Sequence, residues 1–212
     1  MNNKQNHTRD TETLILEAAE KEFLKKGYDG ARTTAIAEAA GVNHAMLHYY
    51  FRTKDKLFEK ILFEKMKCIS DIMLGAIRNS GLSLEKRIQQ GIEQHFDFIA
   101  ANRDLPRFLF NEMHNHPQWL DLIRNNFSNL LEQELRNFQT DIDQNAAEGK
   151  CKRVDAQMIL MDIVSLNLFP FIAAPIIRTA LSILGENDEA FLARRKSENV
   201  KTIFAKLEIK PS

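Results

Sequence analysis

The stretch that decides the fold is TTAIAEAAGVNHAMLHYYF, residues 33–51, in which two short helical segments flank a glycine. Gly41 can adopt the positive φ that a sharp turn between two helices needs. Ala37 is small where the two helices must cross closely, and Asn43 can cap the second of them. Two short helices joined by a turn that contains glycine predict a helix-turn-helix.

Helical periodicity extends over nearly all of the chain, and no sustained strand-like alternation occurs. A first helix is expected from Thr11 to Lys26, Thr34 is a candidate cap for the second, and Thr53 can cap a long fourth. We therefore predict an all-α protein of about nine helices. Residues 1–53 would form a three-helix helix-turn-helix domain, and residues 54–212 a helical bundle for ligand binding and dimerisation.

Three short segments in sequence order carry a family resemblance: AGVN at 40–43, LHYYF at 47–51 and TKDKL at 53–57. This order resembles the TetR family of repressors, over roughly residues 11–60. His48 departs from the pattern, because the family usually has tyrosine there. The resemblance implies a dimeric regulator that binds an operator in double-stranded DNA and is released from it by a small organic effector.

The resemblance also assigns DNA contacts to individual residues. Thr33, Thr34 and Lys54 would hold phosphates, while Tyr50 and Phe51 would pack rather than read bases. The complete set of implied DNA-binding residues is Thr33, Thr34, Asn43, His44, Ala45, His48, Tyr49 and Lys54.

Overall charge gives only weak guidance about a nucleic-acid partner. The chain has 29 Lys and Arg against 29 Asp and Glu, so its formal net charge is zero. Residues 42–60 contain four Lys and Arg against two Asp and Glu. A positive field that attracts DNA would therefore have to be local.

Beyond the fourth helix, the resemblance implies a ligand chamber and a dimerisation surface. Aromatic and methionine side chains are abundant there, although each of them could equally pack a core. The apolar run 158–177 and the last helix, about 187–207, would form the dimer. The candidate ligand-binding residues are His95, Phe108, Glu112, Met113, Trp119, Phe127 and Asn167.

Two other functions stay open at this stage. Glu112, His114 and His116 are residue types that bind zinc, so a metal-binding helical protein or enzyme is the first alternative. The second is a DNA-binding protein that is controlled by a partner protein without any small ligand. No Gly-rich phosphate loop, GxSxG or HExxH motif occurs, so we expect no enzyme and no cofactor.

Cysteine use and the polar first ten residues favour a cytoplasmic protein. Cys68 and Cys151 form no CxxC pair, and residues 1–10 lack the apolar core of a signal peptide. The apolar run 156–177 contains Asp162 and Pro170, so we expect a buried helix there and no membrane span.

Overall fold

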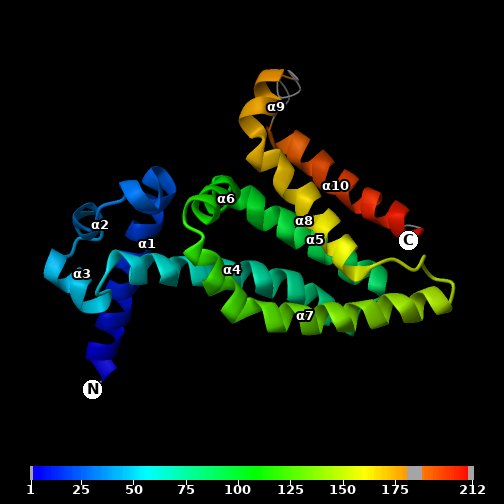
Figure 1. Ribbon diagram of the computed structural model, residues 1–212, viewed down its shortest axis with the longest axis horizontal. Helices are drawn as coiled ribbons and strands as arrows, with labels where there is room; N and C mark the ends of the chain where they lie inside the picture. The colour runs from blue at the N-terminus through cyan, green and yellow to red at the C-terminus, as the bar shows by residue number, and fades with distance from the viewer. Residues whose placement is uncertain (1, 181–187, 210–212) are drawn as a thin grey trace. The chain divides into compact units, whose positions relative to one another are not determined.

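The computed structural model describes residues 2–180 and 188–209, and every regular element in these ranges is a helix (Figure 1). The predicted all-α class is therefore confirmed. The helices are α1 Asn2–Gly30, α2 Thr33–Ala39, α3 His44–Tyr50, α4 Lys54–Arg78, α5 Leu84–Ala101, α6 Leu105–Asn115, α7 Gln118–Ala147, α8 Ala156–Ile172, α9 Ala174–Ala180 and α10 Asp188–Leu207.

Ten helices occur in the described ranges, one more than the approximate count from sequence. The extra helix comes from the apolar run 156–177, which is divided in the structure: α8 continues past Pro170 to Ile172, and a separate α9 begins at Ala174. The first helix is also longer than expected, although Gly27 interrupts its geometry with φ of 72°. Thr34 is not a cap: it lies inside α2, where Arg32 occupies the cap position without a side-chain hydrogen bond. None of the helices that the structure describes is long and apolar enough to cross a membrane.

The chain forms two compact units. The first consists of Met1–Lys67 and Phe108–Ile123, and the second of Cys68–Arg107 and Arg124–Ser212. The N-terminal part of α4 thus belongs to the first unit together with a segment that follows it by some forty residues in sequence. The boundary after residue 53 stays a prediction.

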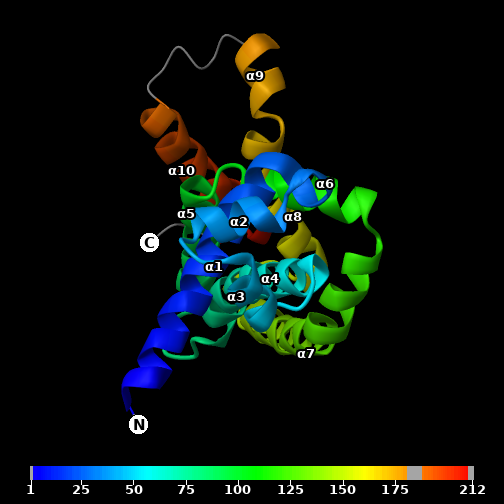
Figure 2. The same ribbon diagram turned by 90° about the vertical axis from the view of Figure 1, so that its left-hand side faces the viewer.

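The first unit has a core of aromatic and aliphatic side chains, and α2 contacts both α1 and α3 (Figures 1 and 2). Apolar residues at helical spacing in α1, such as Ile15, Ala19 and Phe23, are completely buried. Leu47 of α3 and Phe58 of α4 join this core. A helix of only seven residues, such as α3, is unstable alone, so this packing holds it in place.

In the second unit, α5, α8 and α10 contact one another pairwise, and Figure 1 shows the three ribbons side by side. Two of the three begin at side-chain caps: Ser83 accepts a hydrogen bond from the backbone N–H of Lys86, and Asp155 accepts from those of Gln157 and Met158. Their buried faces form the core with parts of α4 and α7.

Three buried polar side chains link α5, α8 and α10. The amide nitrogen of Asn167 donates to the backbone oxygen of Ile92 and to Nδ1 of His95, both at 3.0 Å. Its oxygen accepts from the amide of Asn199 at 2.8 Å. An amide nitrogen only donates, so Nδ1 of His95 carries no proton. Burial accordingly lowers the pKa of His95 to about 4.

We expect the stability of the protein to fall in acid partly because of His95. An unfolded histidine has a pKa near 6.5, whereas that of folded His95 is about 4. Between pH 6.5 and 4 the unfolded chain binds a proton that the folded chain does not, so stability is complete above this window and is lost as pH falls. The slope contribution is about 1.4 kcal/mol per pH unit. Urea unfolding of His95→Gln should show a shallower slope over this window, and equal slopes would contradict the prediction.

Candidate nucleic-acid interface

The turn between α2 and α3 has the geometry that the sequence predicts. Gly41 has φ of 68°, and the N–H of Val42 donates to the backbone oxygen of Ala37 at 3.0 Å. Asn43 caps α3, with its side chain accepting from the N–H of Met46 at 2.7 Å. Ala37 is buried where α2 meets its neighbours, as a close helix crossing requires.

One face of α3 is exposed and the other is buried. Leu47 is completely buried and Phe51 nearly so, while Tyr50 is half-buried against the core. Tyr49 is 80% exposed, and this places an aromatic ring in solvent. The predicted packing role of Tyr50 and Phe51 therefore agrees with their burial. The predicted readers that lie exposed on this face or at its cap are Asn43, His44, Ala45, His48 and Tyr49.

A chain of contacts orders the polar side chains of α3. Nε2 of His44 lies 3.0 Å from the hydroxyl of Thr33 on α2. The rings of His44 and His48 meet edge to face, with centroids 4.4 Å apart. Nδ1 of His48 lies 3.1 Å from the backbone oxygen of Arg52, just beyond the helix. Three of the predicted DNA-contacting residues are thus in one connected arrangement.

Lys54 lies at the start of α4 but is already engaged. Its ammonium lies 4.5 Å from the ring centroid of Tyr28 and donates to the backbone oxygen of Asp29 at 3.3 Å. The Tyr28 hydroxyl donates to the Asp55 carboxylate. Burial, and then Asp55, raise the pKa of Tyr28 well above its usual value. These contacts attach the start of α4 to the end of α1. Thr34, which was also predicted to hold a phosphate, is exposed on α2.

Glu112 has a structural role that the sequence did not indicate. Its side chain is 5% exposed, and Oε1 accepts from the backbone N–H of Tyr28 at 3.0 Å. Nε2 of His116 lies 3.7 Å from Oε2 of Glu112, whereas His114 is exposed. Within residues 2–180 and 188–209, no group of three His, Cys, Asp or Glu side chains is arranged to hold a metal ion. The metal-binding alternative thus gains no support.

The seven predicted ligand-binding residues divide between the two units. Phe108, Met113 and Trp119 pack on the core of the first unit, to which Glu112 also belongs. The other three belong to the second unit: His95 and Asn167 are buried in the polar network, and Phe127 is half-buried on α7.

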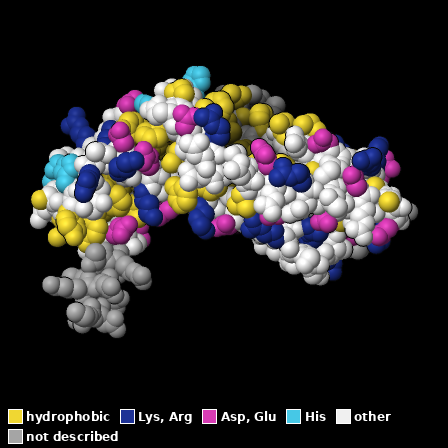
Figure 3. Space-filling model, turned by 60° about the horizontal axis from the view of Figure 1, so that its bottom comes forward, with side chains coloured by type: hydrophobic (Ala, Val, Ile, Leu, Met, Phe, Trp, Pro, Cys, Tyr) yellow, Lys and Arg dark blue, Asp and Glu magenta, His cyan; other side chains and the backbone are white. Residues whose placement is uncertain are grey.

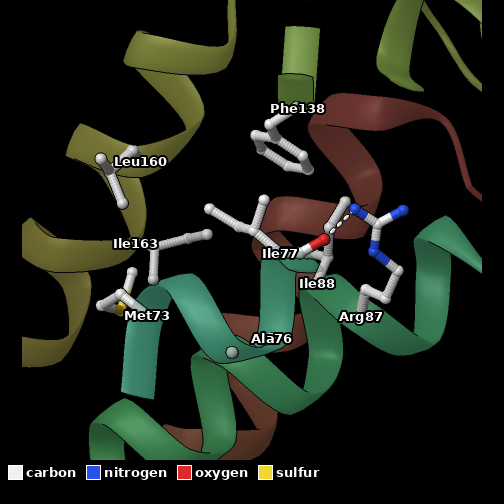
Figure 4. Close-up of a pocket in the computed structure, with 9 residues that line it drawn as sticks. Met73, Ala76, Ile77, Arg87, Ile88, Phe138, Leu160 and Ile163 are labelled. Atoms are coloured by element: carbon white, nitrogen blue, oxygen red, sulfur yellow. Dashed lines mark hydrogen bonds between the residues drawn. The ribbon is translucent and has the colours of Figure 1, made fainter. Parts of the chain in front are cut away.

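A different group of residues surrounds a pocket in the second unit (Figure 4). Arg87 crosses one side of it: one guanidinium nitrogen donates to the backbone oxygen of Ile77 and, at 2.7 Å, to Asp141. The free volume is about 20 Å³, room for about one water molecule. No local sequence pattern indicates this pocket, because its walls come from four helices. The lining residues are Met73, Ala76, Ile77, Arg87, Ile88, Gly91, Phe138, Leu160 and Ile163.

Basic side chains do not gather into one broad patch on the face seen in Figure 3, where Lys and Arg are scattered among acidic and apolar groups. This distribution agrees with the zero net charge. A capped, exposed and polar α3 behind a glycine turn nevertheless defines the class: a helix-turn-helix protein that binds DNA.

Comparison with known proteins agrees with this class. Residues 15–61 match the model of the bacterial regulatory proteins of the tetR family. The chain is 27% identical over 165 residues to "Probable HTH-type transcriptional regulator YttP" of Bacillus subtilis, covering 76% of this chain and 77% of the relative. It is 32% identical over 102 residues to "HTH-type transcriptional repressor SCO4008" of Streptomyces coelicolor, covering 48% of this chain and 49% of that protein.

Solved structures share the fold over almost the whole chain. The TetR family transcriptional regulator PfmR from Thermus thermophilus superposes with a TM-score of 0.62 at 16% identity, covering 93% of this chain and 99% of PfmR. The chain belongs to the TetR family, and it is a DNA-binding transcriptional regulator.

Proposed function

We propose that this regulator is a repressor that binds its operator as a two-fold dimer and leaves it when a mostly apolar organic molecule binds. It acts in the cytoplasm and has no catalytic role. The observation that carries DNA recognition is the exposure of His44, His48 and Tyr49 on α3, a helix that the buried Leu47 holds to the core. Thr33, Thr34 and Lys54 supply backbone contacts beside it.

An apolar stripe on α8 supports the dimer. Met158, Met161 and Phe169 are 46%, 61% and 61% exposed, on a helix that buries Ile159 and Ile163. Leaving such large apolar side chains in water is unfavourable, and a second copy of the helix would cover them. One recognition helix contacts few base pairs, so two copies on a roughly palindromic site give useful specificity.

Pairing of α8 with its copy would not use the pocket of the second unit, so that pocket remains available to an effector. Its walls are apolar except for Arg87, and Met73 can adapt its shape to a ligand. Because the free volume is about 20 Å³, an effector must push these side chains apart. The effector would then bind an expanded state of the protein better than the state described here. Release from DNA requires such a difference in affinity between two states. The repressor role follows the name of SCO4008, with which this chain shares 32% identity.

We expect Tyr49→Ala and Lys54→Ala to weaken operator binding in different ways. Loss of a base contact at Tyr49 should cost about 1–3 kcal/mol on the operator alone. Loss of the Lys54 charge should weaken binding to all duplexes and lower the salt slope by about one. An operator site is first obtained by selection from random duplexes. Fluorescence anisotropy on this site over a series of salt concentrations then measures both the loss of affinity and the salt slope. The mass of the complex, measured by light scattering, gives the number of chains per site.

The matched control for the charge is Lys60→Ala, since Lys60 is exposed and paired with Glu64 one turn further along α4. Its affinity should stay close to that of the wild type. A double variant, His48→Ala with Tyr49→Ala, that keeps wild-type operator affinity would contradict the assignment of α3. A complex with one chain per site would contradict the dimer.

Filling the pocket should abolish effector binding without changing DNA affinity in the absence of effector. Leu160→Phe adds volume at a half-buried lining position, so a ligand would have to compete with the new ring. A panel of aliphatic and aromatic carboxylic acids, screened by thermal shift, should contain compounds that stabilise the wild type and not this variant. Leu130→Phe, at an exposed position of α7, is the control and should keep the response. Equal responses of Leu160→Phe and wild type would exclude this pocket.

A further inference from the structure

The side chain of His48 is exposed on α3, but one of its two ring nitrogens is already committed. Nδ1 lies 3.1 Å from the backbone oxygen of Arg52. A carbonyl oxygen can only accept a hydrogen bond, so Nδ1 must carry the proton and donate it. Neutral imidazole has one ring proton, and the other nitrogen, Nε2, is then an acceptor with a free lone pair. The backbone of the chain itself therefore fixes the tautomer of His48.

His44 differs from His48 in this respect. Its Nε2 lies 3.0 Å from the hydroxyl of Thr33, and a hydroxyl can both donate and accept. This contact therefore leaves the tautomer of His44 undecided. The ring of His44 packs edge to face on that of His48 and restricts how His48 can turn. Of the two histidines on this face, only His48 has a defined hydrogen-bonding character.

A neutral acceptor at this position has few partners on DNA. Phosphate oxygens are themselves acceptors, and so are N7 and O6 of guanine, N7 of adenine and O4 of thymine. The donors in the major groove are the exocyclic amino groups, N6 of adenine and N4 of cytosine. A fixed acceptor on the exposed face of α3 therefore matches only these amino groups, and it is mismatched to the DNA backbone.

We propose that His48 is a specificity-determining residue that accepts a hydrogen bond, through Nε2, from the exocyclic amino group of an adenine or cytosine in the operator. The proposal rests on the proposed function, because it requires α3 to enter the major groove. It assigns to His48 a recognition of base identity, in contrast to Lys54, whose charge suits any phosphate. The carbonyl of Arg52 is the positioning group that sets this preference.

The test uses full-length protein at about pH 8, where free histidine is neutral. Selection from random duplexes with wild type and with His48→Ala identifies the base pair whose preference disappears in the variant. In that pair, adenine is then replaced by purine, or cytosine by 2-pyrimidinone, to delete the amino group alone. Wild-type affinity should fall about 5- to 100-fold, as for loss of one good base contact, and that of His48→Ala should not change.

The matched DNA control replaces the purine of the same pair by its 7-deaza analogue, which deletes the N7 acceptor and keeps any amino group. Wild-type affinity for this duplex should be unchanged, since an acceptor on the protein makes no bond to N7. Lys60→Ala, at an exposed residue of α4 that is not assigned a DNA contact, should keep the dependence on the amino group. Nitrogen-15 NMR of histidine-labelled protein should show the His48 proton on Nδ1.

Each other result overturns the proposal in a recognisable way. If wild-type affinity fell with the 7-deaza analogue and not with deletion of the amino group, His48 would be a hydrogen-bond donor to the base. An equal loss of affinity on all duplexes in His48→Ala, with a smaller salt slope, would make it a phosphate ligand. In both cases the proposed function stands and only the role of His48 fails. If selection with the wild type yielded no preferred DNA site, both the proposed function and this inference would be refuted.

Discussion

Phe58→Ala is expected to lower the free energy of unfolding by about 3–5 kcal/mol, the range for removing a buried phenylalanine. Phe58 is 1% exposed, and its ring centroid lies 5.0 Å from that of Phe23, 5.1 Å from that of Tyr28 and 5.1 Å from that of Trp119. These partners come from separate segments of the first unit. The cavity would therefore weaken the packing of α4 on α1 and on residues 108–123 together.

Urea unfolding followed by circular dichroism measures this effect. The matched control is Phe110→Ala, because Phe110 belongs to the same unit but is 63% exposed. That variant should stay within about 0.5 kcal/mol of the wild type. If both variants lost the same stability, the central position of Phe58 in the core would be refuted.

Asn167→Leu is expected to cost about 2–4 kcal/mol, although leucine is similar in size and more apolar. The substitution removes the donor to Nδ1 of His95 and to the backbone oxygen of Ile92, and the acceptor of the Asn199 amide. These groups stay buried, and each buried polar group without a partner costs about 1–3 kcal/mol. Part of this loss is offset, because Asn199 also donates to the backbone oxygen of Leu166 at 3.2 Å.

The same unfolding experiment tests the network. Asn137→Leu is the control, since Asn137 is exposed on α7, and its stability should stay within about 0.5 kcal/mol of the wild type. An Asn167→Leu variant as stable as the wild type would mean that the three helices pack equally well without their polar link.

The recognition half of the candidate site was predictable because its signals are local. The positive φ of Gly41, the cap at Asn43 and the buried Leu47 all follow from residues that are close together in sequence. Helical periodicity also separates buried Leu47 from exposed Tyr49 without reference to the rest of the chain. Helix ends were harder, as Thr34 illustrates: it was a candidate cap for the second helix, but it lies inside α2, where Arg32 occupies the cap position.

Residues 108–123 show where local reasoning stops. Phe108, Glu112 and Trp119 have the composition of a ligand chamber, and they were expected to line one. In the structure they pack with the DNA-binding helices, and Glu112 accepts a hydrogen bond from the N–H of Tyr28, 84 residues away. Periodicity indicates that a residue is buried but not which surface covers it, since apolar contacts are not directional.

By itself, the sequence determined the helical class, the helix-turn-helix and the exposed face of α3, because hydrogen bonding and side-chain spacing within a helix are set by near neighbours. Only the tertiary structure showed the pocket beside Arg87, the place of residues 108–123 in the first unit, and the hydrogen-bond network around Asn167. Each of these joins helices that are distant in sequence. Their geometry depends on how whole helices pack, and no local pattern encodes that.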